Sequence, residues 1–357
     1  MRTGIAHLPL HYGRTPRWLF ARMVSLAREI TTIIIENYGP NEMLRRLADP
    51  FWFQAFGCVL GFDWHSSGVT TTVCGALKEG MKDISADLGF MVAGGKGAAS
   101  RRTPVEIERA APLLKVDPTP LVYTSRMVAK VDNNALQDGY QLYHHSFFFT
   151  REGAWVVVQQ GMDESSCFAR RYHWLGEEVH DFVCEPHAGI VSEKKLPTLN
   201  LVAQESSQAR ETIAALAREK PEKMIDEFQK IRSLYLPAHH EIRGEDISIE
   251  KLKQNLIKTY ERQEKDFASL LALPGVGAKT IRALSLIAEV VHGVKPSFRD
   301  PARYSFAHGG KDGHPYPVDR TLYDRSIEIL HQAVEQAKVG KREKLSALKR
   351  LAHYLPL

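Results

Sequence analysis

The first part of the chain carries apolar side chains at helical spacing. This periodicity predicts helices over residues 17–37, 41–47 and 69–88. The first ends at a Gly-Pro pair, which stops a helix. Residues 51–62 are so densely apolar that they must lie in the core of the protein.

Strand-like patterning begins near residue 121. Residues 121–124, 139–150 and 154–160 are rich in aromatic and β-branched side chains, and the short link at 151–153 predicts a hairpin between the last two. The stretch 89–130 contains several glycines and prolines and is predicted to be rich in loops.

After Pro197 the pattern is helical throughout. The further helices are predicted over residues 206–219, 221–234, 248–270, 278–292, 319–338 and 341–353. The predicted fold class is therefore α+β, with an N-terminal mixed α/β domain over residues 1–200 and an all-helical domain over residues 201–357. The polar stretch 192–206 is the expected linker.

The most specific segment is the eight residues from Leu273 to Thr280, Leu-Pro-Gly-Val-Gly-Ala-Lys-Thr, between two predicted helices. Pro274 marks the end of the first helix, and the glycines at 275 and 277 are expected to allow positive φ in a tight turn. The free amides of such a turn and of the next helix point outward together, which makes an anion site. Lys279 lies in the first turn of that helix, where the helix dipole disfavours a cation. A phosphate between the lysine and the helix N-terminus would make that position favourable.

These residues resemble the helix-hairpin-helix motif of DNA repair glycosylases, nucleases and polymerases. The resemblance implies a grip on the DNA phosphate backbone that does not read sequence. The residues expected to bind DNA are Gly275, Val276, Gly277, Lys279, Thr280 and Arg282. The alternative is an ordinary corner between two helices that has glycine at a C-cap.

Charge is distributed unevenly along the chain. Residues 251–357 hold 19 Lys or Arg against 11 Asp or Glu, whereas residues 1–250 hold 28 against 31. The basic excess lies with the hairpin, as binding of a polyanion requires, and includes a second basic loop with Lys311. For the run at 341–344 a solvated helix surface is the alternative reading.

Other classes of protein find less support in the composition. The four cysteines are scattered without a Cys-x-x-Cys pair, which argues against a zinc ribbon or an iron–sulfur cluster. No stretch approaches 18 apolar residues, so no membrane span is expected, and an uninterrupted apolar signal region is not found near Met1. We expect a cytoplasmic protein.

The loop that precedes Asp319 supplies a first candidate for chemistry. Asp319 stands at the predicted start of a helix, where it is a favoured N-cap. The segment 317–321 resembles a distorted form of the catalytic segment of hairpin glycosylases, in which an Asp is catalytic, and Lys279 falls where bifunctional members place a Schiff-base lysine. Lys279 and Asp319 are 40 positions apart, however, about twice the usual gap in that family.

The N-terminal domain holds a denser set of reactive side chains. A metal-dependent phosphodiesterase needs oxygen or nitrogen ligands for a divalent cation and a positive group that receives developing charge. Asp63, His65 and His173 are candidate ligands for Mg²⁺ or Mn²⁺, and Lys96 or Arg171 is the candidate charge stabiliser. Each residue alone is more often structural than catalytic.

Over nearly its full length the chain resembles an uncharacterised prokaryotic family, domain-of-unknown-function family 763. The segments 51–57, 62–68, 94–97 and 300–319 carry this resemblance. It implies a DNA-processing role. Three hypotheses remain: a metal-dependent DNA nuclease, a base-excision glycosylase or lyase that uses Lys279 and Asp319, and a non-enzymatic DNA-binding adaptor.

Overall fold

The computed structural model describes residues 15–62, 66–163, 167–192, 195–234, 242, 244, 246–302 and 320–354; in the last range, side chains are described for residues 328–350. The fold is α+β, as predicted. None of the described helices combines the length and apolar composition that a bilayer crossing requires.

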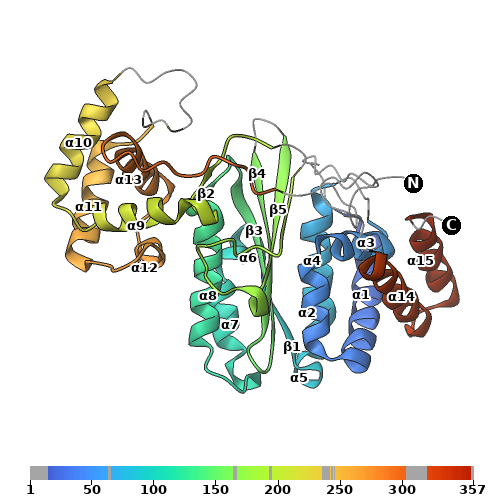
Figure 1. Ribbon diagram of the computed structural model, residues 1–357. Helices are drawn as coiled ribbons and strands as arrows, with labels where there is room; N and C mark the ends of the chain where they lie inside the picture. Colours follow the sequence, from blue (N-terminus) through green and yellow to red (C-terminus); the bar gives the residue numbers. More distant parts are fainter. Residues whose placement is uncertain are drawn as a thin grey trace.

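A five-stranded antiparallel sheet lies at the centre of the protein, with strand order β1-β3-β4-β5-β6 (Figure 1). Its strands are β1 (Phe90–Lys96), β3 (Gln141–Thr150), β4 (Trp155–Asp163), β5 (Phe168–Leu175) and β6 (Gly189–Val191). The predicted hairpin between β3 and β4 is confirmed, and Thr150 N donates to Ala154 O at 2.8 Å to close it. Successive side chains point to opposite faces, so Phe147 and Phe149 join one core and Phe148 the other.

Five N-terminal helices cover the face of the sheet that carries Phe148. They are α1 (Arg17–Tyr38), α2 (Pro40–Ala48), α3 (Pro50–Leu60), α4 (Gly68–Met81) and α5 (Ser85–Leu88). The densely apolar stretch from residue 51 is α3, and its Trp52 and Phe56 are fully buried, as predicted. Asp49 caps this helix, because its Oδ1 accepts from Phe51 N at 2.8 Å and Trp52 N at 3.2 Å.

The opposite face is covered by α6 (Ala98–Arg101), α7 (Thr103–Arg109), a short turn η1 (Ala111–Leu113) and α8 (Thr119–Lys130). The prediction that residues 89–130 are rich in loops is therefore largely wrong. The strand predicted at 121–124 lies inside α8. Its β-branched residues misled the prediction, because Leu121, Val128 and their neighbours are buried at helical spacing against the sheet. A proline near the first turn favours the helix start.

The next helices form a separate cluster beside α8, at the left of Figure 1. They are α9 (Ser207–Leu216), α10 (Pro221–Ser233), α11 (Ile249–Arg262), α12 (Phe267–Ala272) and α13 (Ala278–Val290). Two single turns, η3 (Gly176–Glu178) and η4 (Gln204–Ser206), precede these helices in the chain. The single helix predicted over 248–270 is two helices. Gln263 has φ +52° at the break, and the Asp266 side chain caps α12.

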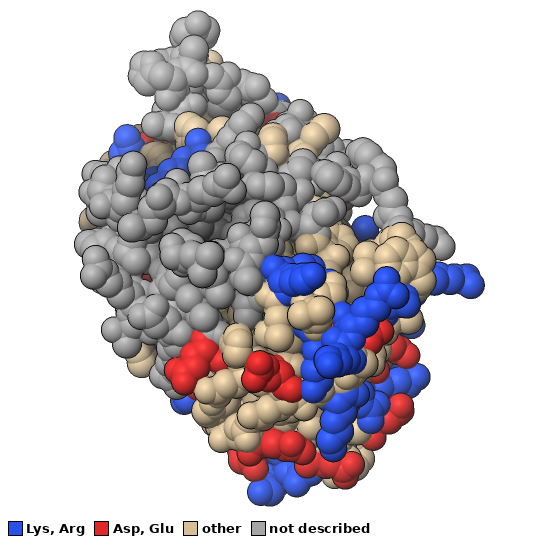
Figure 2. Space-filling view, turned by 90° about the vertical axis from the view of Figure 1, so that its right-hand side faces the viewer, with Lys and Arg blue, Asp and Glu red and all other residues tan. Residues whose placement is uncertain are grey.

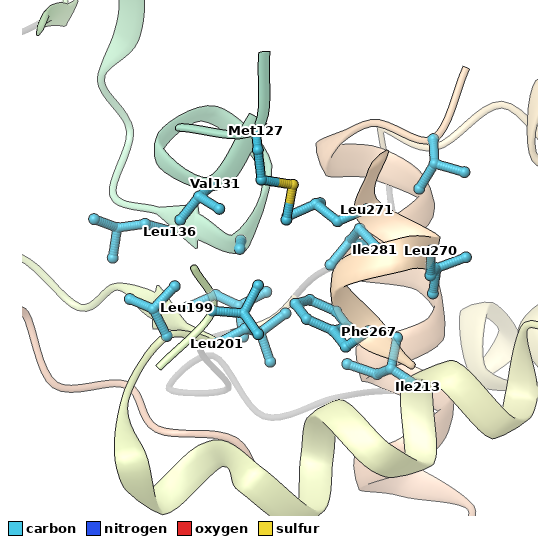
Figure 3. Packing of buried hydrophobic residues seen from close by; sticks show 14 of the residues in the cluster. Met127, Val131, Leu136, Leu199, Leu201, Ile213, Phe267, Leu270, Leu271 and Ile281 are labelled. Carbon is cyan, nitrogen blue, oxygen red and sulfur yellow. The ribbon is translucent and has the colours of Figure 1, made fainter. Parts of the chain in front are cut away.

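Apolar packing joins this helical cluster to the sheet domain without interruption. A single-turn π-helix, η2 (Val131–Ala135), follows α8, and the short strands β2 (Leu136–Gln137) and β7 (Leu199–Asn200) pair beside it. Figure 3 shows Met127 and Val131 facing Leu271 and Ile281 of the helical cluster. All four are buried in one hydrophobic core.

The last two helices lie at the other end of the protein. After α13 the chain passes beside β7, where Asn200 N donates to Ser297 O at 2.9 Å. α14 (Arg320–Gln336) and α15 (Lys341–Tyr354) then pack against α1 and α3 (Figure 1). Arg350 Nη2 donates to Val59 O at 2.6 Å, which fixes α15 to α3.

Candidate nucleic-acid interface

The link between α12 and α13 is a tight turn whose tip, Pro274 and Gly275, is exposed. Val276 N donates to Leu273 O at 3.3 Å across it. Gly275 has φ +92°, a conformation that favours glycine. A Cβ at Gly275 would also lie 3.1 Å from Asn255 Oδ1. The backbone geometry therefore requires glycine at this position.

Gly277 has a different role from the one expected. Its φ of −128° and ψ of −177° are extended backbone that any residue adopts, so the predicted positive φ is wrong at this position. A Cβ at Gly277 would meet nothing within 4 Å. Gly277 is the N-cap of α13, and no side chain caps that helix. The amides of the first turn have no acceptor within the helix, and a helix N-terminus of this kind can bind an anion.

Two of the predicted DNA-binding residues have buried side chains. Val276 is 3% exposed and packs in the core. Thr280 is also 3% exposed, and its hydroxyl accepts from Asn255 Nδ2 at 2.9 Å, which ties α13 to α11. Neither side chain is therefore available for an external contact.

The two predicted cations of α13 share one carboxylate. Lys279 Nζ lies 3.1 Å from Asp246 Oδ2, and Arg282 Nη1 lies 3.1 Å from Asp246 Oδ1. Partial burial raises the pKa of Asp246, but the hydrogen bond from Lys279 and the charge of Arg282 outweigh it, so the pKa lies below the ordinary value. Asp246 thus bridges these two cations.

Polar bridges hold the turn against the sheet domain. Lys130 Nζ donates to Leu273 O at 2.5 Å, at the end of α12. Gln137 Nε2 donates to Ala278 O at 2.9 Å, and Gln137 Oε1 accepts from Arg282 Nε at 2.9 Å. The turn therefore has a fixed orientation relative to the sheet.

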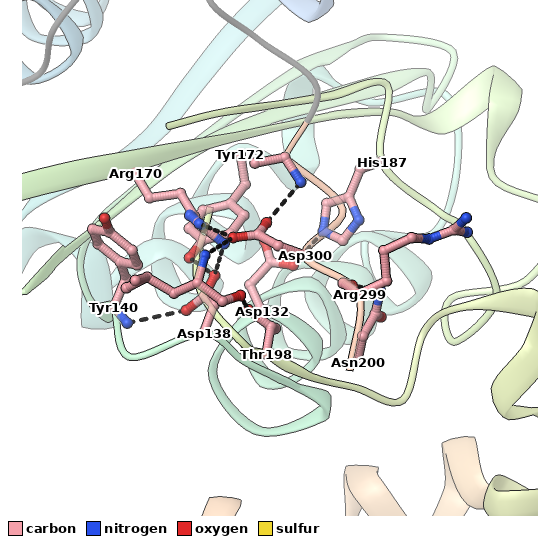
Figure 4. A network of polar contacts seen from close by, with 12 residues as sticks. Asp132, Asp138, Tyr140, Arg170, Tyr172, His187, Thr198, Asn200, Arg299 and Asp300 are labelled. Atoms are coloured by element: carbon pink, nitrogen blue, oxygen red, sulfur yellow. Dashed lines mark hydrogen bonds and ion pairs between the residues drawn. The ribbon is translucent and has the colours of Figure 1, made fainter. Parts of the chain in front are cut away.

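A buried polar network lies behind these bridges (Figure 4). Asp132, in η2, is fully buried and accepts from Trp174 Nε1 at 2.9 Å and from Gln159 Nε2. Its other oxygen lies 2.5 Å from His187 Nε2. Single π-helical turns often mark functional positions. This one carries Asp132 and lies between Lys130 and Gln137, the two residues that bridge to the turn.

The second part of the network is an arginine between two carboxylates. Arg170 lies 2.9 Å from Asp138 Oδ2 and 2.6 Å from Asp300 Oδ2, and all three side chains are buried. Tyr172 OH donates to Asp138 Oδ2 at 2.7 Å. Asp300 is on the segment that returns from α13, so the ion pair ties that segment to the sheet.

Sequence reasoning assigned no role to Asp246, Gln137 or the Asp138–Arg170–Asp300 bridge. These residues belong to separate parts of the chain, and their partners lie 32 to 145 positions away. A single sequence contains no signal for such pairings, because only the folded chain brings them together.

The predicted catalytic residues Arg171 and His173 lie on the face of the sheet that packs against the N-terminal helices, opposite to the face that carries Arg170 and Tyr172. Both are fully buried. Arg171 Nη2 donates to Gln54 Oε1 at 3.0 Å, and its guanidinium lies 4.6 Å from the Phe53 ring centre. Burial lowers the pKa of Arg171 to about 9. His173 Nδ1 lies 2.9 Å from Leu47 O, and burial together with Arg171 holds its pKa well below the ordinary value.

Lys96 shares a cross-strand row with Arg171. The register places Lys96 opposite His144, His144 opposite Gln160, and Gln160 opposite Arg171. Two strands separate Lys96 from Arg171, which puts them roughly 14 Å apart at strand spacing. Lys96 is exposed and its Nζ lies 5.6 Å from the Tyr143 ring centre.

Four predicted site residues, Asp63, His65, Lys311 and Asp319, lie outside the described residues. Among the residues that are described, no group of three or more His, Cys, Asp or Glu side chains is placed to hold a metal ion. His173 is thus the one predicted metal ligand whose surroundings are described.

The basic excess of residues 251–357 is divided between two ends of the protein. Figure 2 shows the end formed by α1, α14 and α15, where Lys and Arg side chains gather beside Asp and Glu. Lys341, Arg342 and Lys349 of α15 are exposed there, with Arg22 of α1. Among the described residues of this range, the cations of α11 to α13 lie near the turn between α12 and α13.

A comparison with known families finds one match, which covers residues 4–318 and is described as "Protein of unknown function (DUF763)". The chain belongs to this family. The resemblance to family 763 is thereby confirmed, and the matched range includes both the five-stranded sheet and the turn between α12 and α13 of this DUF763 protein. Comparison with curated proteins and with solved structures returned no match.

Proposed function

We propose that this DUF763 protein binds the phosphate backbone of DNA through the turn between α12 and α13. The observation that carries this proposal is the N-terminus of α13, where uncapped amides lie beside Lys279 and Arg282. Backbone amides at a helix N-terminus together with basic side chains form an anion site. The tip of the turn is exposed, which suits a phosphate on a polymer strand.

Such a site reads no base sequence. Amides and single cations bind phosphate oxygens, which are the same at every nucleotide. The side chains that could have read base edges, Val276 and Thr280, are buried. We therefore infer that this DUF763 protein binds DNA with little preference for sequence.

The test is the salt dependence of binding to a 20-base-pair duplex, measured by fluorescence anisotropy. We expect Lys279→Ala with Arg282→Ala to weaken binding to unrelated sequences about equally and to flatten the slope of log K against log salt by about 2, since each lost phosphate contact removes about 0.9. The control is Lys223→Ala with Lys230→Ala, which removes the same charge from exposed positions of α10. Equal effects of the two pairs, or no binding by the wild type at low salt, would contradict the proposal.

Asp246 provides a second prediction for the same site. Because its carboxylate holds both Lys279 and Arg282, it competes with phosphate for them. We expect Asp246→Asn to tighten duplex binding roughly twofold to fivefold, the range of a weak ion pair of up to about 1 kcal/mol. The control is Glu250→Gln, which removes one negative charge from an exposed position nearby. If both variants tighten binding alike, only net charge matters.

We propose metal-dependent hydrolysis of DNA as a second candidate function, and the arrangement of His173 favours it. Its Nδ1 is held by Leu47 O, while its buried Nε2 has no hydrogen-bond partner among the described residues. A histidine that ligates a metal is commonly held in this way through its other ring nitrogen. His173 would hold Mg²⁺ or Mn²⁺, which would activate a water, and Arg171 beside it would stabilise negative charge.

The second candidate ranks lower because of geometry: His173 and the hairpin lie on opposite faces of the sheet. The deciding assay is nicking of undamaged plasmid with Mg²⁺, Mn²⁺ or EDTA, in the wild type and in His173→Gln. Nicking that needs metal and is lost in the variant supports hydrolysis.

The same assay separates the remaining alternatives. Cleavage in EDTA that is confined to damaged bases, with a borohydride-trapped adduct lost in Lys279→Ala, supports a glycosylase or lyase. For that role the Lys279 amine must first leave Asp246, which it contacts through the carboxylate and, at 2.8 Å, the backbone carbonyl. Binding without any cleavage supports an adaptor.

A further inference from the structure

α11 lies directly beside the hairpin turn. Asn255 Nδ2 donates to Thr280 Oγ1 of α13 at 2.9 Å. A Cβ built on Gly275, at the tip of the turn, would lie 3.3 Å from Lys258 Nζ. One flank of α11 is therefore continuous with the proposed phosphate site.

That flank carries a line of cations. Residues 251, 255, 258 and 262 are spaced by four, three and four positions, so their side chains lie along one stripe of the helix. Lys251, Lys258 and Arg262 are exposed, and no ion pair engages their side chains among the described residues. In contrast, Lys279 and Arg282 are both paired with Asp246.

The other flank of α11 differs in character. Leu252, Leu256 and Thr259 are buried and face the core. Beyond them, on the side away from the hairpin, a single exposed cation, Lys253, stands with the partly exposed Tyr260. The cations are thus concentrated on the side of α11 that adjoins the turn.

We propose that the stripe formed by Lys251, Lys258 and Arg262 extends the DNA-binding surface beyond the turn and contacts further phosphates of the same nucleic acid. At 1.5 Å per residue the eleven positions from Lys251 to Arg262 span about 16 Å. This length corresponds to about five nucleotides of a duplex strand, at about 3.4 Å each. The footprint is then a backbone track along α11 that passes Gly275 near its middle.

This inference rests on the proposed function, and the experiment separates the two. Binding of a 20-base-pair duplex is measured against salt for the full-length wild type, for Lys251→Ala, Lys258→Ala and Arg262→Ala together, and for Lys253→Ala. Thermal unfolding checks that each variant is folded. We expect the triple variant to flatten the salt slope by about 2 to 3, whereas Lys253→Ala leaves it within about 0.3 of the wild type.

Each outcome decides one of the two claims. If the wild type binds and the triple variant keeps its slope, the track along α11 is overturned while the turn remains the binding site. If Lys253→Ala and the single variant Lys258→Ala flatten the slope equally, the contribution of α11 is diffuse charge and the track is likewise overturned. If the wild type does not bind at low salt, the function itself is overturned and the track with it.

Discussion

Acidification from pH 7 to pH 5 is expected to lower the free energy of unfolding by about 2 kcal/mol through His144 alone. His144 and His145 are adjacent on β3 and point to opposite faces of the sheet, where both are buried. Burial, with nearby His145 and Lys96, lowers the pKa of His144 to about 3. Burial also lowers the pKa of His145, although Gln159 and Asp132 oppose it.

The sign follows from proton uptake. In the unfolded chain each histidine takes up a proton near its ordinary pKa of about 6.5, whereas in the fold both stay neutral at that pH. Below about pH 6.5 the unfolded state therefore binds more protons, and stability falls as the pH falls. Each neutral histidine contributes a slope of up to about 1.4 kcal/mol per pH unit until the pH reaches its folded pKa.

Urea unfolding between pH 7 and 5 checks this expectation. His144→Gln should reduce the average pH slope over this range by about 1 kcal/mol per unit, whatever its effect on stability at pH 7. His292→Gln, at an exposed position after α13, is the matched control against which the slope of His144→Gln is compared. Burial raises the pKa of Asp49 and of Asp138, and a raised carboxyl pKa increases stability as the pH falls. The difference in pH slope between the two histidine variants is therefore the quantity that tests the expectation. An unchanged slope in His144→Gln would contradict the expectation.

Much of the fold could be predicted because its signals are local. α1, α2, α13 and the hairpin of β3 and β4 were predicted with bounds close to those observed, since periodicity, Gly-Pro stops and turn residues lie within each segment. The turn at 273–277 was also located by its own residues. These elements depend little on distant contacts.

Other elements depend on tertiary packing. β1 contains two glycines with positive φ, at 94 and 95, and reads as a loop, yet it pairs with β3 along its whole length. A Cβ at Gly94 would lie 2.2 Å from His145 O, so the close approach of two strands explains a glycine that favours neither helix nor strand. α8 shows the reverse error, because burial against the sheet overrides the β preference of its residues.

In the candidate site too, local features could be predicted from the sequence, whereas features that depend on tertiary contacts could not. The exposed turn, Lys279 and Arg282 were predictable from consecutive residues. Asp246 and Gln137, which orient those cations, were not, because they lie 33 and 145 positions from the residues that they contact. The helical stripe on α11 has a regular spacing, but its relevance depends on its position beside Gly275, which only the fold shows.

A carboxylate placed at Gly277 is expected to abolish most of the proposed DNA binding while leaving the fold intact. Gly277 is an uncapped N-cap in extended backbone with open space around its Cβ position, so Asp is accommodated without strain. The Asp side chain would accept from the amides of α13 and place a negative charge where the phosphate binds. Loss of charge-assisted hydrogen bonds worth about 1.5 to 3 kcal/mol corresponds to roughly tenfold to hundredfold weaker binding.

Gly277→Asn is the matched control, because it caps the helix with the same geometry and without the charge. At an N-cap glycine is only a few tenths of a kcal/mol weaker than Asp or Asn, so thermal unfolding of both variants should stay close to that of the wild type. Duplex binding at low salt should fall in the order wild type, Asn, Asp, since Asn obstructs the amides and Asp also repels phosphate. If Gly277→Asp unfolds normally and binds DNA as well as the wild type, then the N-terminus of α13 is not the phosphate site.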